Sequence, residues 1–119
     1  MVALAAILAF LAVALGAFGA HGLRKYKTPE QLTVFQTGVH YQMVHALAML
    51  VIGSLLQYVG VKSVDFSIAL WLFFIGILLF SGSLYAITFT AIRKFGAITP
   101  LGGLCFLAGW FFVMLYAIR

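Results

Sequence analysis

Hydrophobic residues form four long runs along this chain, separated by three short polar stretches. Each run has the length that a helix needs to cross about 30 Å of hydrocarbon. We expect helices over about 1–20, 29–59, 66–90 and 100–118, with the membrane span of the second helix at 39–59. The pattern therefore predicts an all-α integral membrane protein, in which residues 1–119 form a single transmembrane domain built as a four-helix bundle.

The first apolar run resembles a signal peptide in length, and two features argue against cleavage. No Lys or Arg precedes its apolar core. Phe18 would occupy the position three residues before a cut after Ala20, where a small residue is needed. We therefore expect this run to be a retained transmembrane helix.

Small residues recur along the first and fourth helices at spacings that place them on one face. Such stripes allow two helices to approach closely, although alanine is also simply common in membrane helices. We expect them to serve helix packing and association of the chain into a homo-oligomer. The positions are Ala5, Ala9, Ala12, Gly16, Gly19 and Ala20 in the first helix, and Gly102, Gly103 and Gly109 in the fourth.

Two short motifs and one acidic residue predict where helices begin. Thr28, Pro29 and Gln31 match a capping box with proline at the first helical position. Thr99-Pro100 repeats the Thr-Pro start before the fourth helix, and Asp65 is expected to cap the third helix.

Composition and charge place the chain in lipid and orient it. Charged residues make up 8% and hydrophobic residues 66%, so a soluble domain could not cover its own surface. The loops after the first and third helices carry five positive residues, against Lys62 and Arg119 on the other side. The positive-inside rule then puts these two loops in the cytoplasm and both termini outside. The net charge of +5 forms no nucleic-acid patch. It sets topology or contacts anionic headgroups through Arg24, Lys25, Lys27, Arg93 and Lys94.

Polar residues of the spans gather in the half that we place toward the cytoplasm. A channel or transporter needs polar groups or water across the full thickness, so this asymmetry weakens that reading. A cytoplasm-facing pocket, or a polar network that locks the bundle, fits better. The candidates for ligand binding or for such a network are His21, His40, Tyr41, Gln42, His45, Ser81, Ser83 and Tyr85.

His45 is the sharpest of these candidates, because an ionisable residue inside the membrane is a functional hypothesis by default. The alternative is a neutral imidazole bonded to Tyr85 or to a serine of the third helix. His40 lies about 140° around the helix from His45, so the two cannot readily share a metal. No ligand spacing supports a metal site from His21, His45 and Cys105, and the sequence identifies no cofactor.

Catalysis is poorly supported by the residues present. Glu30 and Asp65 are the only carboxylates and are expected on opposite faces of the membrane. No Ser or Cys lies in a nucleophile motif, and Cys105 is the only cysteine. We expect a non-enzymatic module whose pocket, at His21, Tyr41, Gln42 and His45, binds a lipid, a small ligand or a partner protein. A small-solute or proton transporter in which His45 titrates, and a haem- or metal-binding redox subunit, are the alternatives.

Four motifs in order resemble a known family. They are GAFGAHGL, FQTGVHYQMVHALAML, SGSLYAI and ITPLGGLCFLAGW. Together they resemble the domain of unknown function 423 family, small four-helix membrane proteins of bacteria with eukaryotic relatives such as transmembrane protein 256. The resemblance implies a multi-pass protein of the bacterial plasma membrane, and it implies no activity.

Overall fold

The computed structural model describes residues 1–119, and its secondary structure is entirely helical. Four helical rods are each long and apolar enough to cross a membrane, which confirms the predicted all-α four-helix transmembrane architecture. The first rod is α1 (Val2–His21), and the second is α2 (Pro29–Ser54) with a π-helical turn, η2 (Leu55–Val59). The third is α3 (Val64–Gly76), a π-helical turn η3 (Ile77–Ser81) and α4 (Gly82–Thr90), and the fourth is α5 (Thr99–Ile118).

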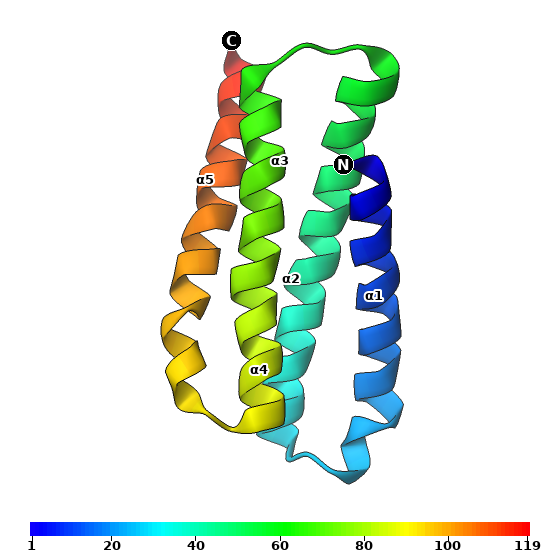
Figure 1. The fold of residues 1–119 in the computed structure, drawn as a ribbon, viewed down its shortest axis with the longest axis vertical. Coiled ribbons are helices and arrows are strands. Elements are labelled where there is room, and N and C mark those ends of the chain that lie inside the picture. Colours follow the sequence, from blue (N-terminus) through cyan, green and yellow to red (C-terminus); the bar gives the residue numbers. More distant parts are fainter.

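The rods lie in the order α1, α2, α3–α4, α5 across the molecule, each antiparallel to the next (Figure 1). The Cα atoms extend over 48 × 26 × 18 Å. The main packing contacts join α1 to α2, α2 to the third rod, and α3 to α5. The bundle is therefore open, with α1 and α5 at opposite edges.

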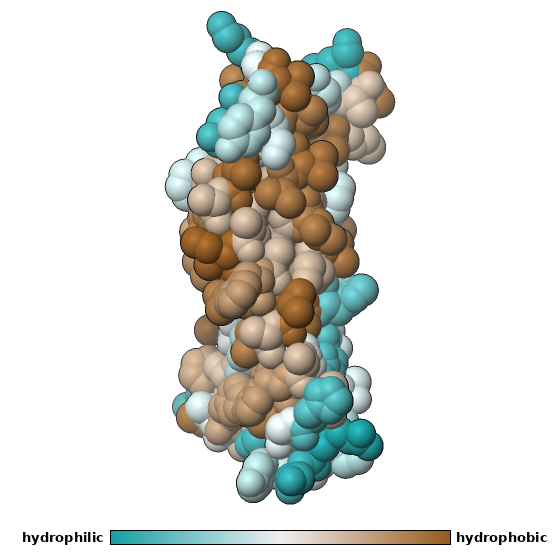
Figure 2. Space-filling model, turned by 90° about the vertical axis from the view of Figure 1, so that its right-hand side faces the viewer, coloured by the Kyte–Doolittle hydropathy of each residue, from teal (hydrophilic) through white to brown (hydrophobic).

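The two ends of the rods differ in charge. We call one the basic end, because its two loops, which contain η1 (Leu23–Lys25) and η4 (Arg93–Ala97), hold five of the seven Lys and Arg residues. The loop between α2 and α3 and the chain's C-terminus lie at the opposite end (Figure 1). A hydrophobic surface band separates the two hydrophilic ends (Figure 2).

The register of α1 against α2 indicates which part of α2 lies in hydrocarbon. A Cβ atom added to Gly53 would lie 3.3 Å from the Val2 side chain, and one added to Gly19 would lie 2.8 Å from the Phe35 ring. Residues 2–20 of α1 carry no polar side chain, so this whole stretch can lie in hydrocarbon. We call the part of α2 that lies beside this stretch, from about Phe35 to Gly53, the hydrocarbon zone. The membrane span of α2 expected at 39–59 stays a prediction.

The start of α2 has the predicted capping box. The Thr28 hydroxyl accepts a bond from the Gln31 backbone N–H at 3.2 Å, and the Gln31 side chain accepts one from the Thr28 N–H at 2.9 Å. Pro29 is the first helical residue. This prediction is confirmed, since every group involved lies within one turn of sequence.

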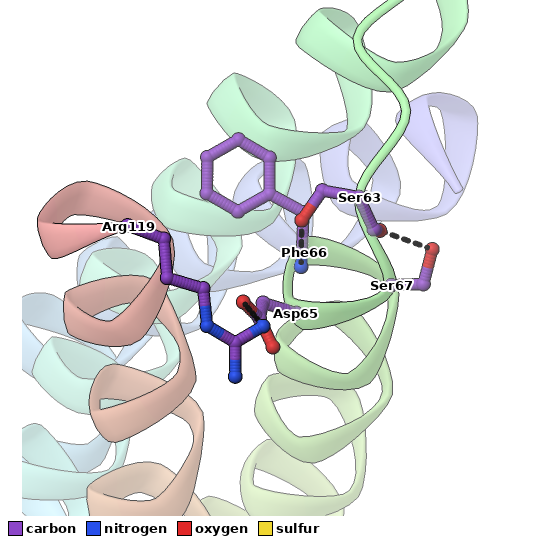
Figure 3. A network of polar contacts seen from close by, with 5 residues as sticks. All are labelled: Ser63, Asp65, Phe66, Ser67 and Arg119. Carbon is purple, nitrogen blue, oxygen red and sulfur yellow. Dashed lines mark hydrogen bonds and ion pairs between the residues drawn. The ribbon is translucent and has the colours of Figure 1, made fainter.

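The prediction that Asp65 caps the third helix is wrong. Ser63 is the N-cap, and its hydroxyl accepts a bond from the Phe66 N–H at 3.2 Å (Figure 3). Asp65 lies in the first turn and is buried, where its carboxylate pairs with the Arg119 guanidinium at 2.9 Å. The pair ties the last residue of the chain to the start of α3.

Thr99 does not cap the fourth helix either. It is the first residue of α5, whose N-cap, Ile98, has no capping side chain. The Thr99 hydroxyl instead forms a hydrogen bond with the Ser83 hydroxyl of α4. This bond joins the first turn of α5 to the third rod at the basic end.

Small residues allow close helix contacts within the chain. Ala5, Ala12 and Gly19 are buried on α1, which packs against α2. On α5, a Cβ atom at Gly109 would lie 2.6 Å from the Phe73 ring, and one at Gly102 would overlap the backbone of η3. These five small residues are buried inside one chain, and association into a homo-oligomer stays a prediction.

Candidate functional site

Gln42 joins three helices at the centre of the bundle. Its side chain is buried, and its amide N–H donates to the Leu8 carbonyl of α1 at 2.8 Å. Its amide oxygen accepts a bond from the Tyr85 hydroxyl of α4 at 2.7 Å. Because both ends of the amide are bonded, Gln42 acts here as a cross-link between helices.

His45, one turn further along α2, points toward α5. Its Nδ1 lies 2.7 Å from the Tyr41 carbonyl oxygen, and the Trp110 indole N–H donates to its Nε2 at 3.0 Å. A carbonyl only accepts and an indole N–H only donates, so the two partners select the neutral tautomer with the proton on Nδ1. The expected partner, Tyr85 or a serine, is wrong, because the Tyr85 hydroxyl is bonded to Gln42.

Further polar contacts tie the remaining elements to this centre. The Ser81 hydroxyl donates to the Gly38 carbonyl at 2.6 Å, and the Gln36 amide donates to the Gly16 carbonyl at 3.2 Å. No buried side-chain nitrogen or oxygen lacks a hydrogen-bond partner. Such a fully bonded set is the arrangement in which buried polar groups stabilise a unique packing.

Only two of the four residues of the expected polar pocket come together, since the Tyr41 and His45 rings stack with centroids 6.1 Å apart while Gln42 and His21 lie elsewhere. Gln42 faces α1 and α4, His45 faces α5, Tyr41 is 40% exposed, and His21 is exposed at the end of α1. The α1–α2 register explains why His21 lies apart from His45. It places His21 outside the hydrocarbon zone, whereas His45 lies deep inside it.

The other candidates lie as follows. His40 is exposed on α2, Ser81 and Ser83 are buried, and no three His, Cys, Asp or Glu side chains converge on a common point. At the basic end, the Lys27 ammonium lies 5.7 Å from the centre of the Phe89 ring. The remaining basic candidates are exposed there: Arg24, Lys25, Arg93 and Lys94.

A groove of about 680 Å³ lies between α2 and α5. The His45 and Phe106 rings stack in it with centroids 3.6 Å apart, and the Tyr41 ring lies 4.6 Å from Phe80. We call it the aromatic groove. Its lining residues are Tyr41, Val44, His45, Phe80, Pro100, Gly103, Leu104, Phe106, Leu107 and Trp110.

Three of the groove's aromatic residues were not among the sequence candidates: Phe80, Phe106 and Trp110. Trp110 carried a usable signal, because an indole N–H inside a membrane needs an acceptor and His45 is among the few available. Phe80 and Phe106 carried none, since apolar rings are common throughout the spans. The groove itself depends on Gly103. A Cβ atom added there would lie 4.0 Å from its nearest neighbour, so the absence of a side chain at this position leaves the space open.

The family profile described as "Protein of unknown function (DUF423)" matches residues 15–103. This chain belongs to that family, which confirms the resemblance of its four motifs. It is 49% identical to the UPF0382 membrane protein YwdK of Bacillus subtilis over 98% of this chain and 94% of the relative. It is 43% identical to the UPF0382 membrane protein SH2409 of Staphylococcus haemolyticus, over 94% of this chain and 89% of the relative. The UPF0382 inner membrane protein YgdD of Escherichia coli is 39% identical over 100% of this chain and 89% of the relative. No solved structure matches the chain.

Proposed function

We propose that this DUF423 protein is a non-enzymatic membrane module that holds the hydrocarbon chain of a lipid in the aromatic groove. The observation that carries the proposal is the groove itself, an apolar hollow of about 680 Å³ that opens on the lipid-facing surface. Its volume falls within the range of about 300–1,000 Å³ that is typical of small-molecule sites.

The depth of the groove supports a ligand from the lipid phase. The His45–Trp110 and Tyr41–Phe106 contacts show that α5 runs level with α2 along the groove. Tyr41 and His45 lie between Phe35 and Gly53, so the groove opens inside the hydrocarbon zone. A water-soluble ligand would have to leave water to reach it, whereas a lipid chain is already there.

The walls of the groove are held in place before any ligand arrives. The His45–Trp110 hydrogen bond fixes the indole, and Phe106 is buried against both the His45 and Phe80 rings. Binding to such a preorganised surface costs less ordering entropy than binding to mobile side chains. This favours selective retention of a chain over the transient contacts made by ordinary surrounding lipid.

The bonding of Gln42 and His45 supports a holding role over a proton or solute transporter. Both His45 nitrogens and both ends of the Gln42 amide are already bonded within the protein. A transport step through them would have to break contacts that join α2 to its neighbours. We place the protein in the plasma membrane with the basic end in the cytoplasm, where its exposed Lys and Arg residues would contact anionic headgroups.

Photo-crosslinking tests this function. The protein is reconstituted with a phosphatidylcholine that carries a diazirine in mid-chain, and the labelled peptides are mapped by mass spectrometry. Label should concentrate on residues 41–45 and 100–110. Gly103→Leu fills the groove and should reduce label there about tenfold, since losing contact with two methylenes costs about 1.6 kcal/mol.

Gly82→Leu is the matched control, because a Cβ atom added to Gly82 has no neighbour within 4 Å and the residue lies outside the groove. It should leave the label on residues 100–110 unchanged. Even labelling of all exposed apolar faces, unaffected by Gly103→Leu, would refute the proposal.

A further inference from the structure

A strip of polar side chains lies on the outer face of α2, and we call it the polar strip. It lines a hollow of about 420 Å³. On the molecular surface, hydrophilic colour reaches from the basic end along one edge toward the hydrophobic band (Figure 2). The lining residues are Leu32, Thr33, Gln36, Thr37, His40 and Tyr41.

His40 is out of place for a surface that meets only acyl chains. It lies five residues beyond Phe35, which is about 7 Å into the hydrocarbon zone at a rise of about 1.5 Å per residue. Its side chain is exposed and forms no hydrogen bond, and its contact with the Tyr41 ring, 5.8 Å between centroids, is edge-on. Leaving a polar group unbonded in hydrocarbon is unfavourable, so this position calls for a polar occupant.

The polar strip leads directly into the aromatic groove. Tyr41 lines both hollows. Thr33, Thr37 and Val44 lie within about 40° of one another around α2 at about 100° per residue, so both hollows follow one face of the helix. Together they form a path that is polar toward the basic end and apolar deeper in the membrane, which is the shape of an amphiphile.

The polar strip offers more hydrogen-bond acceptors than donors. It therefore favours a ligand whose polar head group can donate a hydrogen bond. The Thr33 and Thr37 hydroxyls already donate to the Pro29 and Thr33 carbonyls, at 3.0 and 2.8 Å, so their oxygens can only accept. The Gln36 amide donates one of its two N–H groups to the Gly16 carbonyl, while its amide oxygen has no partner. The second Gln36 N–H can still donate, and His40 and Tyr41 can each serve as donor or acceptor.

The charges around the strip select an uncharged head. No Lys, Arg, Asp or Glu lines the hollow. Glu30 lies seven residues before Thr37, on the same face of α2, so the charged residue nearest the strip on this face offers no positive charge to a phosphate. A charged head about 7 Å inside hydrocarbon with no counter-ion would also be poorly solvated.

We infer that the occupant is a lipid alcohol, whose uncharged hydroxyl head binds the polar strip at His40 while its chain lies in the aromatic groove. The inference rests on the proposed function, since it uses the same groove for the chain. It adds the chemical class of the ligand and the position of its head.

Three photoactivatable probes with the same chain test it: a diacylglycerol, a phosphatidylcholine and a phosphatidic acid, each reconstituted at equal mole fraction. Diacylglycerol should label the groove about tenfold more than either phospholipid, which corresponds to about one hydrogen bond. His40→Leu should reduce diacylglycerol labelling to the phospholipid level. His21→Leu, which changes an exposed histidine outside the strip, should not.

Equal labelling by all three probes, with no effect of His40→Leu, would overturn the inference and leave the proposed function standing. Stronger labelling by phosphatidic acid would also overturn it. Failure of every probe to label the groove would remove the proposed function as well. A second copy of the chain is the competing occupant, and efficient His40→Cys cross-linking between chains in a Cys105→Ser background would overturn the inference in its favour.

Discussion

Replacing Trp110 with Phe removes the only donor to His45 Nε2 and leaves most of the local packing in place. Phe retains a six-membered ring at a position where the Trp110 centroid lies 4.9 Å from that of Phe73. The Trp110 side chain is 43% exposed, so part of the lost surface faces lipid rather than protein. The main effect of the substitution is therefore the loss of one hydrogen bond of 3.0 Å.

The expected cost follows from the environment of that bond. Hydrogen bonds between membrane helices contribute about 0.6 kcal/mol on average and up to about 1.7 kcal/mol. Leaving a buried acceptor without a partner costs about 1–3 kcal/mol. We expect Trp110→Phe to lower the free energy of unfolding by about 1–2 kcal/mol.

A double-mutant cycle separates the bond from the packing. Reversible unfolding in mixed micelles of a mild detergent and sodium dodecyl sulfate would be measured for the parent, Trp110→Phe, His45→Phe and the double variant. A coupling energy of about 1 kcal/mol is expected, because the second substitution has no bond left to break. Trp71→Phe is the control, since Trp71 is 57% exposed and forms no side-chain hydrogen bond. Additivity within about 0.3 kcal/mol would refute the assigned contact.

Two further predictions concern packing and orientation. Gly102→Ala should lower the free energy of unfolding by about 1–3 kcal/mol, because the added methyl group overlaps the Phe80 backbone. Gly82→Ala is the control and should not be destabilising, since the space around Gly82 is open. Equal effects of the two substitutions would contradict the packing described. In a Cys105→Ser background, a membrane-impermeant maleimide should label Val64→Cys in intact cells and Tyr26→Cys only after the inner face is exposed. Labelling of Tyr26→Cys from outside would reverse the proposed orientation.

The features that the sequence predicted well are those controlled by lipid or by neighbouring residues. Hydrocarbon requires every backbone group of a span to be bonded within its own helix, so run length alone defines four helices. The capping box at Thr28 and Gln31 needs only groups within one turn. Asp65 looked like a cap by the same local reasoning, but its partner, Arg119, comes from the far end of α5. No local pattern contains that information.

The candidate site was predicted in part, for a related reason. His45 and Gln42 were identified as unusual because polar residues are rare in the spans. Their partners depend on how far each helix slides along its neighbour, and hydrophobic runs leave that register undetermined. His21 was grouped with His45 by the side of the membrane on which both were placed, whereas the register separates them in depth. The groove had no sequence signature, because it depends on the space beside Gly103.

The distribution of bonds around α2 also has a consequence for biosynthesis. A ribosome makes α1 before α2, so Gln42 can find the Leu8 carbonyl as soon as the first hairpin enters the membrane. His45 satisfies Nδ1 within its own helix, but Nε2 must wait for Trp110 on α5, the last of the four helices to be made. The Gln42 amide oxygen waits for the Tyr85 hydroxyl of α4, and His45 Nε2 is the acceptor that stays open longest. Insertion of α5 closes it, so this contact forms only after all four helices are in the membrane.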